Sequence, residues 1–259
     1  MKAYLVRVGI DCTKPKKKNE DTGQFNAPVN LETGEFAYVP IKETEDIRSG
    51  SERTFKDFID PCRKVGKELP SRLWYENTHL DPDFLELTYG DVDGYNKITG
   101  KTNNRGEPLR TLKADDLIVF YVGLEPIRHL SEHHDRLCYA IIGIFRVKES
   151  IPARDFYERG SGDKNAHTRR LYFDPDIIVS AKREGSGRLD KCLPIGEYRG
   201  HAYRVKEHTL KNWGGLVNNP TGYIQRSARL PEFKEPQRFY DWFERQLSER
   251  NIRLIQRNN

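Results

Sequence analysis

Two apolar segments, residues 117–122 (LIVFYV) and 138–147 (CYAIIGIFRV), decide how this chain folds. Both are rich in β-branched and aromatic residues, which favour β-strands. A polar turn at residues 112–116 leads into the first segment, and a single loop joins the two. We therefore expect them to be adjacent antiparallel strands of a curved sheet.

Further elements surround this hairpin along the rest of the chain. Three more segments predict strands: residues 3–10 (AYLVRVGI), 36–41 (FAYVPI) and 177–181 (IIVSA). Residues 236–249 predict a helix whose core-facing stripe is formed by Phe239, Phe243 and Leu247. The expected fold class is α+β, with a curved antiparallel sheet or a partly open β-barrel, flanking helices and long loops. Without an internal repeat or linker, we expect one domain over residues 1–259, with a hairpin core at about 112–148.

The composition indicates a polar globular protein. Apolar residues make up 36% of the 259 residues, yet 12 Phe, 13 Tyr and 3 Trp are enough to build a core. No apolar run approaches the roughly 18 residues of a membrane span, and the first residues do not resemble a signal peptide. The four cysteines are far apart and form no CxxC pair, which favours a reducing compartment. We expect a cytoplasmic protein without a membrane partner.

Charge is distributed unevenly along the chain. Residues 1–150 carry a formal charge of −2, whereas the basic half, residues 151–259, carries +7. Of the 21 basic side chains in that half, 15 are arginines, which bind phosphate in a bidentate manner and stack on bases. This predicts a nucleic acid or nucleotide partner, with DNA favoured over RNA, although a solvated surface explains the charge almost as well.

The segment 112–147 resembles a recurring element of the PUA-like superfamily, which includes the ASCH and EVE-like domains. In these domains a Gly-Asp turn leads into a strand that ends in Phe or Tyr, and a later strand reads IIGIFxV. The present chain has Ala114-Asp115 at the turn, which departs from that pattern. The resemblance implies a small curved β-barrel that holds a nucleotide or a modified base in a pocket. An ordinary buried hairpin is the alternative interpretation.

Several separated blocks also resemble the nucleotide modification associated domain family, third type. The blocks are LVRVGID (5–11), NAPV (26–29) with FAYVPI (36–41), HLDPDF (79–84), TYGD (88–91), NAH (165–167) and QRSAR (225–229). The lysine-rich segment 14–20 is extra relative to that pattern. The resemblance implies a role in recognising or modifying nucleic-acid bases, but it implies no particular reaction.

One cluster of candidate site residues lies in the segment NAHTRR, which contains Asn165, His167, Arg169 and Arg170, with Ser186 grouped beside it. A histidine transfers protons near neutral pH. The arginines are suited to clamping phosphate, and the turn at Ser186 is suited to presenting N–H groups to an anion. A basic surface loop is the alternative interpretation.

Two further clusters have the composition of a base-recognition site. In an extended strand, Gln225, Ser227 and Arg229 lie on one face, where Gln and Arg can read base edges. The other cluster combines aromatic and polar groups suited to an extruded base: Trp74, His79, Asp81, Thr88, Tyr89 and Asp91. A polar strand face and structural capping are the respective alternatives.

We expect these blocks to form one site, because buried polar groups need partners and a pocket supplies them. The predicted concave surface holds Asn165, His167, Ser186, Gln225, Ser227 and Arg229, with His79, Tyr89 and Asp91 at its edge. Neither a cofactor nor a metal site is predicted. The loop with His129, His133, His134 and Asp135 has the composition of metal ligands, but no further ligand set accompanies it.

Two functions remain open at this point. The first is a binding protein that recognises a modified or flipped base in a base-modification or defence system. The second is an enzyme that processes a nucleobase or nucleotide, with His167, Asp81 or Asp91 as acid–base groups. The motifs of P-loop, Rossmann, zincin, nucleophile-elbow and zinc deaminase enzymes are absent. A reader requires an aromatic cage and a basic rim, whereas an enzyme requires a histidine or carboxylate within reach of the base.

Overall fold

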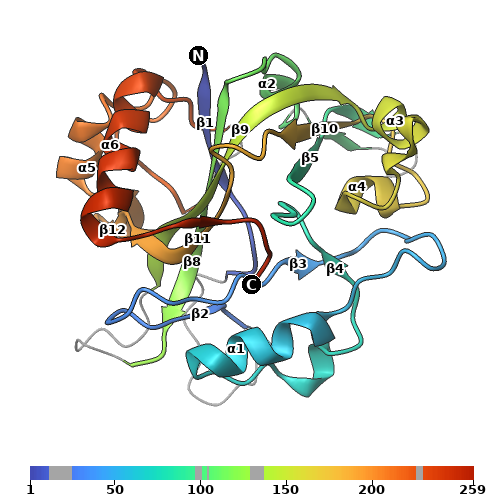
Figure 1. Ribbon diagram of the computed structural model, residues 1–259, viewed down its shortest axis with the longest axis horizontal. Helices are drawn as coiled ribbons and strands as arrows, with labels where there is room; N and C mark the ends of the chain where they lie inside the picture. Colours follow the sequence, from blue (N-terminus) through green and yellow to red (C-terminus); the bar gives the residue numbers. More distant parts are fainter. Residues whose placement is uncertain (12–24, 97–100, 104, 129–136, 226–229) are drawn as a thin grey trace.

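The computed structural model describes residues 1–259 except 12–24, 97–100, 104, 129–136 and 226–229 (Figure 1). At its centre, β8 (Leu117–Pro126) and β9 (Cys138–Pro152) are antiparallel neighbours. The prediction of an antiparallel hairpin is therefore confirmed. The loop with His129, His133, His134 and Asp135 lies outside the described residues, so the structure does not test their expected lack of a metal.

Strands from both halves of the chain extend this hairpin into an eight-stranded sheet. Two strands pair with β8: β1 (Ala3–Arg7) and the short β2 (Pro28–Val29). Two strands pair with successive parts of β9: β11 (Gly187–Pro194) and β10 (Asp176–Ala181). The sheet is completed by β5 (Thr88–Val92) beside β10 and β14 (Leu254–Ile255) beside β11.

The sheet is mixed, which corrects the expectation of an antiparallel one. Strands β1 and β2 run parallel to β8, whereas the pairs around β9 are antiparallel. Parallel neighbours need a long connection, and the chain from Arg7 to Leu117 provides one. The described strands do not close into a barrel, so the PUA-like barrel stays a prediction.

Both faces of the central strands are buried. On β8, Ile118 and Phe120 contact a first core that also contains Phe84 and Tyr89. The alternate residues Val119 and Tyr121 contact a second core on the other face. Because successive side chains of a strand point to opposite faces, burial on both sides requires an uninterrupted apolar run. This explains why residues 117–122 read LIVFYV without alternation.

The remaining elements are helices and small strand pairs. The α-helices are α1 (Ile59–Val65), α2 (Glu107–Arg110), α3 (Ala153–Phe156), α4 (Ala166–Arg169), α5 (Glu207–Asn212) and α6 (Pro236–Arg250). The strand pairs are β3 (Ile41–Lys42) with β4 (Thr78–His79), β6 (Gly94–Asn96) with β7 (Lys101–Asn103), and β12 (Gly196–Arg199) with β13 (Ala202–Val205). Short turns of other helix types occur at Phe55–Phe58, Ser71–Leu73 and Tyr157–Ser161. Within the described part of the chain, no helix has the length and apolar character to cross a bilayer.

The second core is covered by α5 and α6, which lie together beside β1 and β8, away from α3 and α4 (Figure 1). Helix α6 begins at Pro236, as predicted, because proline is tolerated in the first turn of a helix. Its residues Phe239 and Phe243 are fully buried, and Leu247 packs against the same core. The predicted apolar stripe is therefore confirmed.

Candidate functional site

A cavity of about 520 Å³ opens beside the edge strand β1 and the strand β5. Its polar lining comes from segments far apart in the sequence: Arg7, Asp11, Lys42, Glu43, Thr44, His79, Asp81, Tyr89, Asp91, Arg105, His167 and Arg170. The four basic side chains in this lining balance the four carboxylates, so the cavity is polar without being strongly basic. Its volume is in the usual range for sites that bind small molecules.

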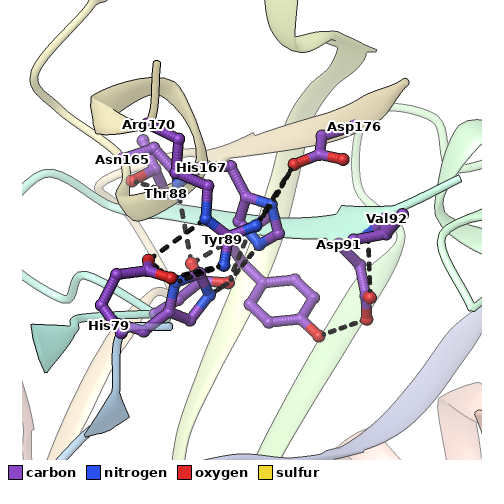
Figure 2. Close-up of polar contacts among 12 residues, drawn as sticks. His79, Thr88, Tyr89, Asp91, Val92, Asn165, His167, Arg170 and Asp176 are labelled. Carbon is purple, nitrogen blue, oxygen red and sulfur yellow. Dashed lines mark hydrogen bonds and ion pairs between the residues drawn. The ribbon is translucent and has the colours of Figure 1, made fainter. Parts of the chain in front are cut away.

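Two buried histidines meet edge to face at one end of the cavity, with ring centroids 4.7 Å apart (Figure 2). His79 comes from β4 and His167 from α4. Each imidazole contacts a buried carboxylate through Nδ1. The distance from His79 Nδ1 to Glu43 Oε2 is 2.7 Å, and that from His167 Nδ1 to Asp176 Oδ2 is 2.5 Å. These contacts fix the orientation of both rings. The Nε2 atom of each ring is directed away from the carboxylate that its Nδ1 contacts, and we call Glu43 and Asp176 the outer carboxylates.

Asp81 lies where the two rings converge. Its Oδ2 is 3.6 Å from Nε2 of His167 and 4.0 Å from Nε2 of His79. The Gly90 amide donates to both carboxylate oxygens at 3.0 Å, and the Asn165 amide group donates to Oδ1 at 3.1 Å. His79, Asp81 and His167 thus bring three ligand-type atoms within 4.8 Å of one another, all from buried residues. This is the set of residues, within the described part of the chain, that could hold a metal ion.

Arg170 connects the two outer carboxylates (Figure 2). Its guanidinium donates to Glu43 Oε1 at 3.0 Å and to Glu43 Oε2 at 3.2 Å, and it lies 3.7 Å from Asp176 Oδ2. A planar guanidinium suits such a bridging position because its five donors point in fixed directions. The result is a layer of Glu43, Arg170 and Asp176 behind the two imidazoles.

These neighbours shift the pKa values of the cluster in different directions. Burial alone lowers the pKa of His167, but Asp176 and Asp81 outweigh it and raise the pKa to about 9. Burial also lowers the pKa of His79, and the contact with Glu43 does not compensate for it. Burial raises the pKa of Glu43, but His79 and Arg170 overcome this effect and bring it well below its usual range. The outer carboxylate Glu43 therefore stays ionised.

The other end of the cavity carries two ion pairs and a phenol. Arg7 pairs with Asp11, and Arg105 Nε lies 3.2 Å from Asp91 Oδ2. The Tyr89 hydroxyl donates to the same oxygen of Asp91 at 2.9 Å (Figure 2). Burial, with the charge of Asp91, raises the pKa of Tyr89 well above its ordinary value. The Tyr89 phenol therefore keeps its hydrogen, which it donates to Asp91.

Local backbone requirements explain the sequence around the cluster. A Cβ at Gly90 would lie 2.4 Å from Cδ2 of His167, so only glycine leaves room for that ring. Asn165 is the N-cap of α4, and its side chain accepts a hydrogen bond from the His167 amide at 2.8 Å. The same side chain donates to Thr88 Oγ1 at 3.2 Å. Asn165 thus ties the start of α4 to β5 and to Asp81.

The structure brings together part of the predicted site. His79, Asp81, Tyr89, Asp91 and His167 line the cavity. Asn165 lies directly behind it, since its side chain donates to Asp81, and Thr88 accepts a hydrogen bond from Asn165. These residues come from two of the three predicted clusters.

Other predicted residues lie elsewhere. Ser186 accepts a hydrogen bond from the Arg146 amide, and Arg169 is directed to the Asp163 carbonyl. Trp74 donates to the Leu69 carbonyl, which is a structural contact. Gln225 is near one wall, because its carbonyl accepts from Arg7, but its side chain accepts from the Tyr203 amide. Ser227 and Arg229 fall outside the described residues.

Sequence reasoning missed six charged residues of this region: Arg7, Asp11, Lys42, Glu43, Arg105 and Asp176. Glu43 is 36 residues from its partner His79, and nothing near it in the sequence marks it. Asp176 had a weak local signal, because it directly precedes the apolar strand IIVSA. Arg7 also had a weak local signal, because it is a charged residue within an otherwise apolar strand.

Comparison with family models provides the wider context. The model of nucleotide modification associated domain 3 matches residues 2–231. The chain belongs to this family. The match includes the cavity and the cluster and ends before α6. Comparisons with curated proteins and with solved structures give no match. The description of the nucleotide modification associated domain 3 family connects the chain with nucleotide modification systems and a nucleotide-related function.

Proposed function

We propose that the cavity binds the base of a nucleotide or of a nucleic acid and that the His79–Asp81–His167 cluster acts on it chemically. The observation that carries this proposal is the placement of two carboxylate-oriented imidazoles and a third carboxylate at the wall of one cavity. Buried ionisable groups are costly to maintain, and perturbed pKa values cluster at functional sites. Membership of a family associated with nucleotide modification supports a nucleotide-related ligand.

The balance of charge around the cavity favours the base over a polyphosphate as the buried part of the ligand. Arg7, Arg105 and Arg170 are each paired with a carboxylate. A phosphate would have to displace these carboxylates, whereas a base offers donors and acceptors that match both members of a pair. Because the Tyr89 hydroxyl donates its one hydrogen to Asp91, its oxygen suits an N–H donor of the base.

The alternative function is a reader of modified or flipped bases, which the PUA-like resemblance of the β8–β9 hairpin favours. A reader holds its base by stacking in an aromatic cage. Tyr89 is the one phenyl-type ring in the described lining of the cavity, and its ring packs on Phe120 with centroids 5.3 Å apart. The contacts of this site therefore favour the enzyme over the reader.

A binding and turnover experiment tests the proposal. Nucleosides, nucleoside monophosphates and short single- and double-stranded DNA and RNA are titrated at low salt in EDTA, with DNA as the first nucleic acid. We expect one ligand class to bind. Incubation without EDTA, followed by mass spectrometry, should reveal a modified base or nucleotide. Binding without any turnover would support the reader, and no binding of any class would contradict both functions.

Variants locate the binding site. Arg105→Met removes one charged donor at the cavity wall and should weaken binding about 10–100-fold, the usual value of a hydrogen bond to a charged group. Arg245→Met removes an exposed arginine of α6 and should leave binding unchanged. Equal effects of the two substitutions would indicate general electrostatic attraction instead of a specific site, because such attraction follows net charge and salt.

A further inference from the structure

We propose that His79, Asp81 and His167 bind a divalent first-row transition metal ion. Each residue offers one ligand atom, and these atoms lie within 4.8 Å of one another in a buried setting. Two imidazoles and one carboxylate are ligands that Zn²⁺ and Fe²⁺ accept. This inference deepens the proposed function by supplying a reactive centre, and it rests on that function only for what the ion does.

The hydrogen bonds behind the two histidines are those of metal ligands. Glu43 and Asp176 each accept a hydrogen bond from an imidazole Nδ1, at 2.7 Å and 2.5 Å. A metal-bound histidine typically donates its second ring nitrogen to a carboxylate in this way, which fixes the tautomer and makes the other nitrogen a better ligand. With Nδ1 of each ring donating to its carboxylate, Nε2 is the nitrogen that an ion can bind, and at His167 the ion would displace the second proton. A single carboxylate–histidine pair is common in proteins, but here two such pairs converge on a third carboxylate.

The distances at the point of convergence suit an ion better than a proton. Nε2 of His167 and of His79 lie 3.6 Å and 4.0 Å from Asp81 Oδ2. Both values exceed the range of about 2.7–3.2 Å in which a shared proton makes a good hydrogen bond. Ligand atoms at about 2.1 Å from a tetrahedral Zn²⁺ are roughly 3.4 Å apart. Small side-chain movements would therefore complete the ligand triangle.

The charge of the surrounding groups also matches a dication. Glu43, Asp81 and Asp176 contribute three negative charges to the buried network, and Arg170 contributes one positive charge. The net charge of these four side chains is −2, and an ion at the three inner ligands would replace the second proton of the His167 imidazole. Because unpaired buried charge is strongly unfavourable, a divalent cation at the three inner ligands would neutralise the network.

The site is rigid on one side and open on the other. The Gly90 amide and the Asn165 side chain fix the Asp81 carboxylate, and all three ligand residues also line the cavity. Three protein ligands with an accessible remaining position are typical of catalytic metal sites rather than structural ones. When bound, such an ion would polarise a base carbonyl or activate a water molecule. This proposal replaces the sequence-based expectation that the chain has no metal site.

Metal titration of the full chain tests the proposal in the absence of nucleotide. Protein stripped with EDTA and dialysed is titrated with Zn²⁺ and, separately, with Mg²⁺ in a calorimeter. We expect one Zn²⁺ per chain and no binding of Mg²⁺ at the same concentrations, because Mg²⁺ prefers oxygen ligands. His79→Asn and His167→Asn should each weaken Zn²⁺ binding by about 100-fold or more. His208→Asn, at an exposed position of α5, should not. Zn²⁺ binding of equal affinity in the His79→Asn/His167→Asn double variant would overturn the proposal.

Positioning residues provide a second test. Glu43→Gln and Asp176→Asn keep the ligands but weaken their support, and each should lower the affinity for Zn²⁺ about 10–100-fold. A third test uses the native chain, so it needs no variant to fold.

When Co²⁺ is added to the native chain, the visible absorption spectrum should show the bands of a nitrogen–oxygen site of low coordination number. Absence of these bands, or sulfur-to-cobalt charge transfer that assigns the ion to cysteines, would overturn the proposal.

These tests are separable from those of the proposed function. Nucleotide binding in EDTA addresses the cavity alone, whereas metal stoichiometry without nucleotide addresses the cluster alone. A chain that binds the base but no metal would retain its proposed ligand and lose the metal centre. A chain that binds Zn²⁺ at His79 and His167 but no nucleotide would retain the metal centre and lose its proposed ligand.

Discussion

Gly90 is the residue on which the cluster most directly depends. It lies in β5, and the missing side chain lets the imidazole of His167 lie against the strand. Its amide also holds the Asp81 carboxylate at 3.0 Å. One glycine therefore supports two of the three inner groups, one through its lack of a side chain and the other through its backbone.

Gly90→Ala should disrupt the cluster and destabilise the fold. The new Cβ would lie 2.4 Å from Cδ2 of His167 and 3.0 Å from Oδ1 of Asn165. Insertion of a methyl group into a packed site costs about 1–3 kcal/mol of unfolding free energy, measurable by urea denaturation. Gly50→Ala is the control: its neighbourhood is open within 4 Å, so it carries only the cost of its positive φ. Gly90→Ala should also lower the affinity for Zn²⁺, and an equal loss of affinity in Gly50→Ala would contradict this explanation.

Asn165 has a structural task that a carboxylate cannot perform. Its oxygen caps α4, while its NH₂ group donates to Asp81 and Thr88. Asn165→Asp keeps the acceptor but loses both donors and places a negative charge beside Asp81. We expect a loss of about 1–3 kcal/mol in unfolding free energy, measured by urea denaturation of metal-free protein. The exposed Asn218→Asp should change it by less than about 0.5 kcal/mol; a similarly small change at Asn165 would show that the amide donors are dispensable.

The residues of the site differ in how far the sequence predicts them. His79, Asp81, Asp91 and His167 occur in short polar blocks where apolar periodicity fails, and this made them recognisable as candidates. Glu43 has no such signal and Asp176 only a weak one, because each is defined by a partner that only the folded chain brings near. Ser186 is a different case, because it does not line the cavity and its expected role in anion binding stays a prediction. A Gly-Ser turn is typical of anion sites, but here the hydroxyl serves the Arg146 amide.

At the scale of elements, burial on two faces determines which strands are recognisable. Strand β8 is apolar on both faces, so its sequence alone predicts a central strand. The direction of β8 relative to β1 cannot be predicted in this way, because neither apolar run indicates whether the pairing is parallel or antiparallel. That choice depends on the path of the long intervening chain, which is why the antiparallel expectation failed at this edge.

Helix α6 stabilises the second core without contributing to the cavity. Phe243 is fully buried there, whereas Glu244 beside it is exposed. Phe243→Ala should lower the unfolding free energy by about 3–5 kcal/mol through lost burial and the cavity left behind. Glu244→Ala should change it by less than about 0.5 kcal/mol. Zn²⁺ affinity of the folded Phe243→Ala protein should equal that of the wild type; a large decrease would contradict the separation of the second core from the site.

At the scale of the whole molecule, the family match ends earlier in the sequence than the packed core does. The match ends at residue 231, but the second core continues with Phe233, Phe239, Trp242 and Phe243. The last residues also reach the first core on the other face of the sheet. Asn258 accepts from the Phe84 amide at 2.7 Å, and Asn259 bonds both the amide and the carbonyl of Tyr38. Residues 232–259 therefore connect the two cores.

Truncation tests whether this connection is required. A chain of residues 1–231 loses the aromatic cover of Trp213, which packs against Phe233, Phe239 and Trp242 with centroids 5.3–5.5 Å apart. Loss of several buried aromatic residues, at about 3–5 kcal/mol each, exceeds the usual total stability of about 5–15 kcal/mol. We expect no cooperative thermal unfolding. The matched chain 1–257 loses only Asn258 and Asn259 and should unfold cooperatively at a lower temperature, because the Phe84 and Tyr38 backbone groups lose their partners. A 1–231 chain that melts like the full chain would show that the matched region folds without α6.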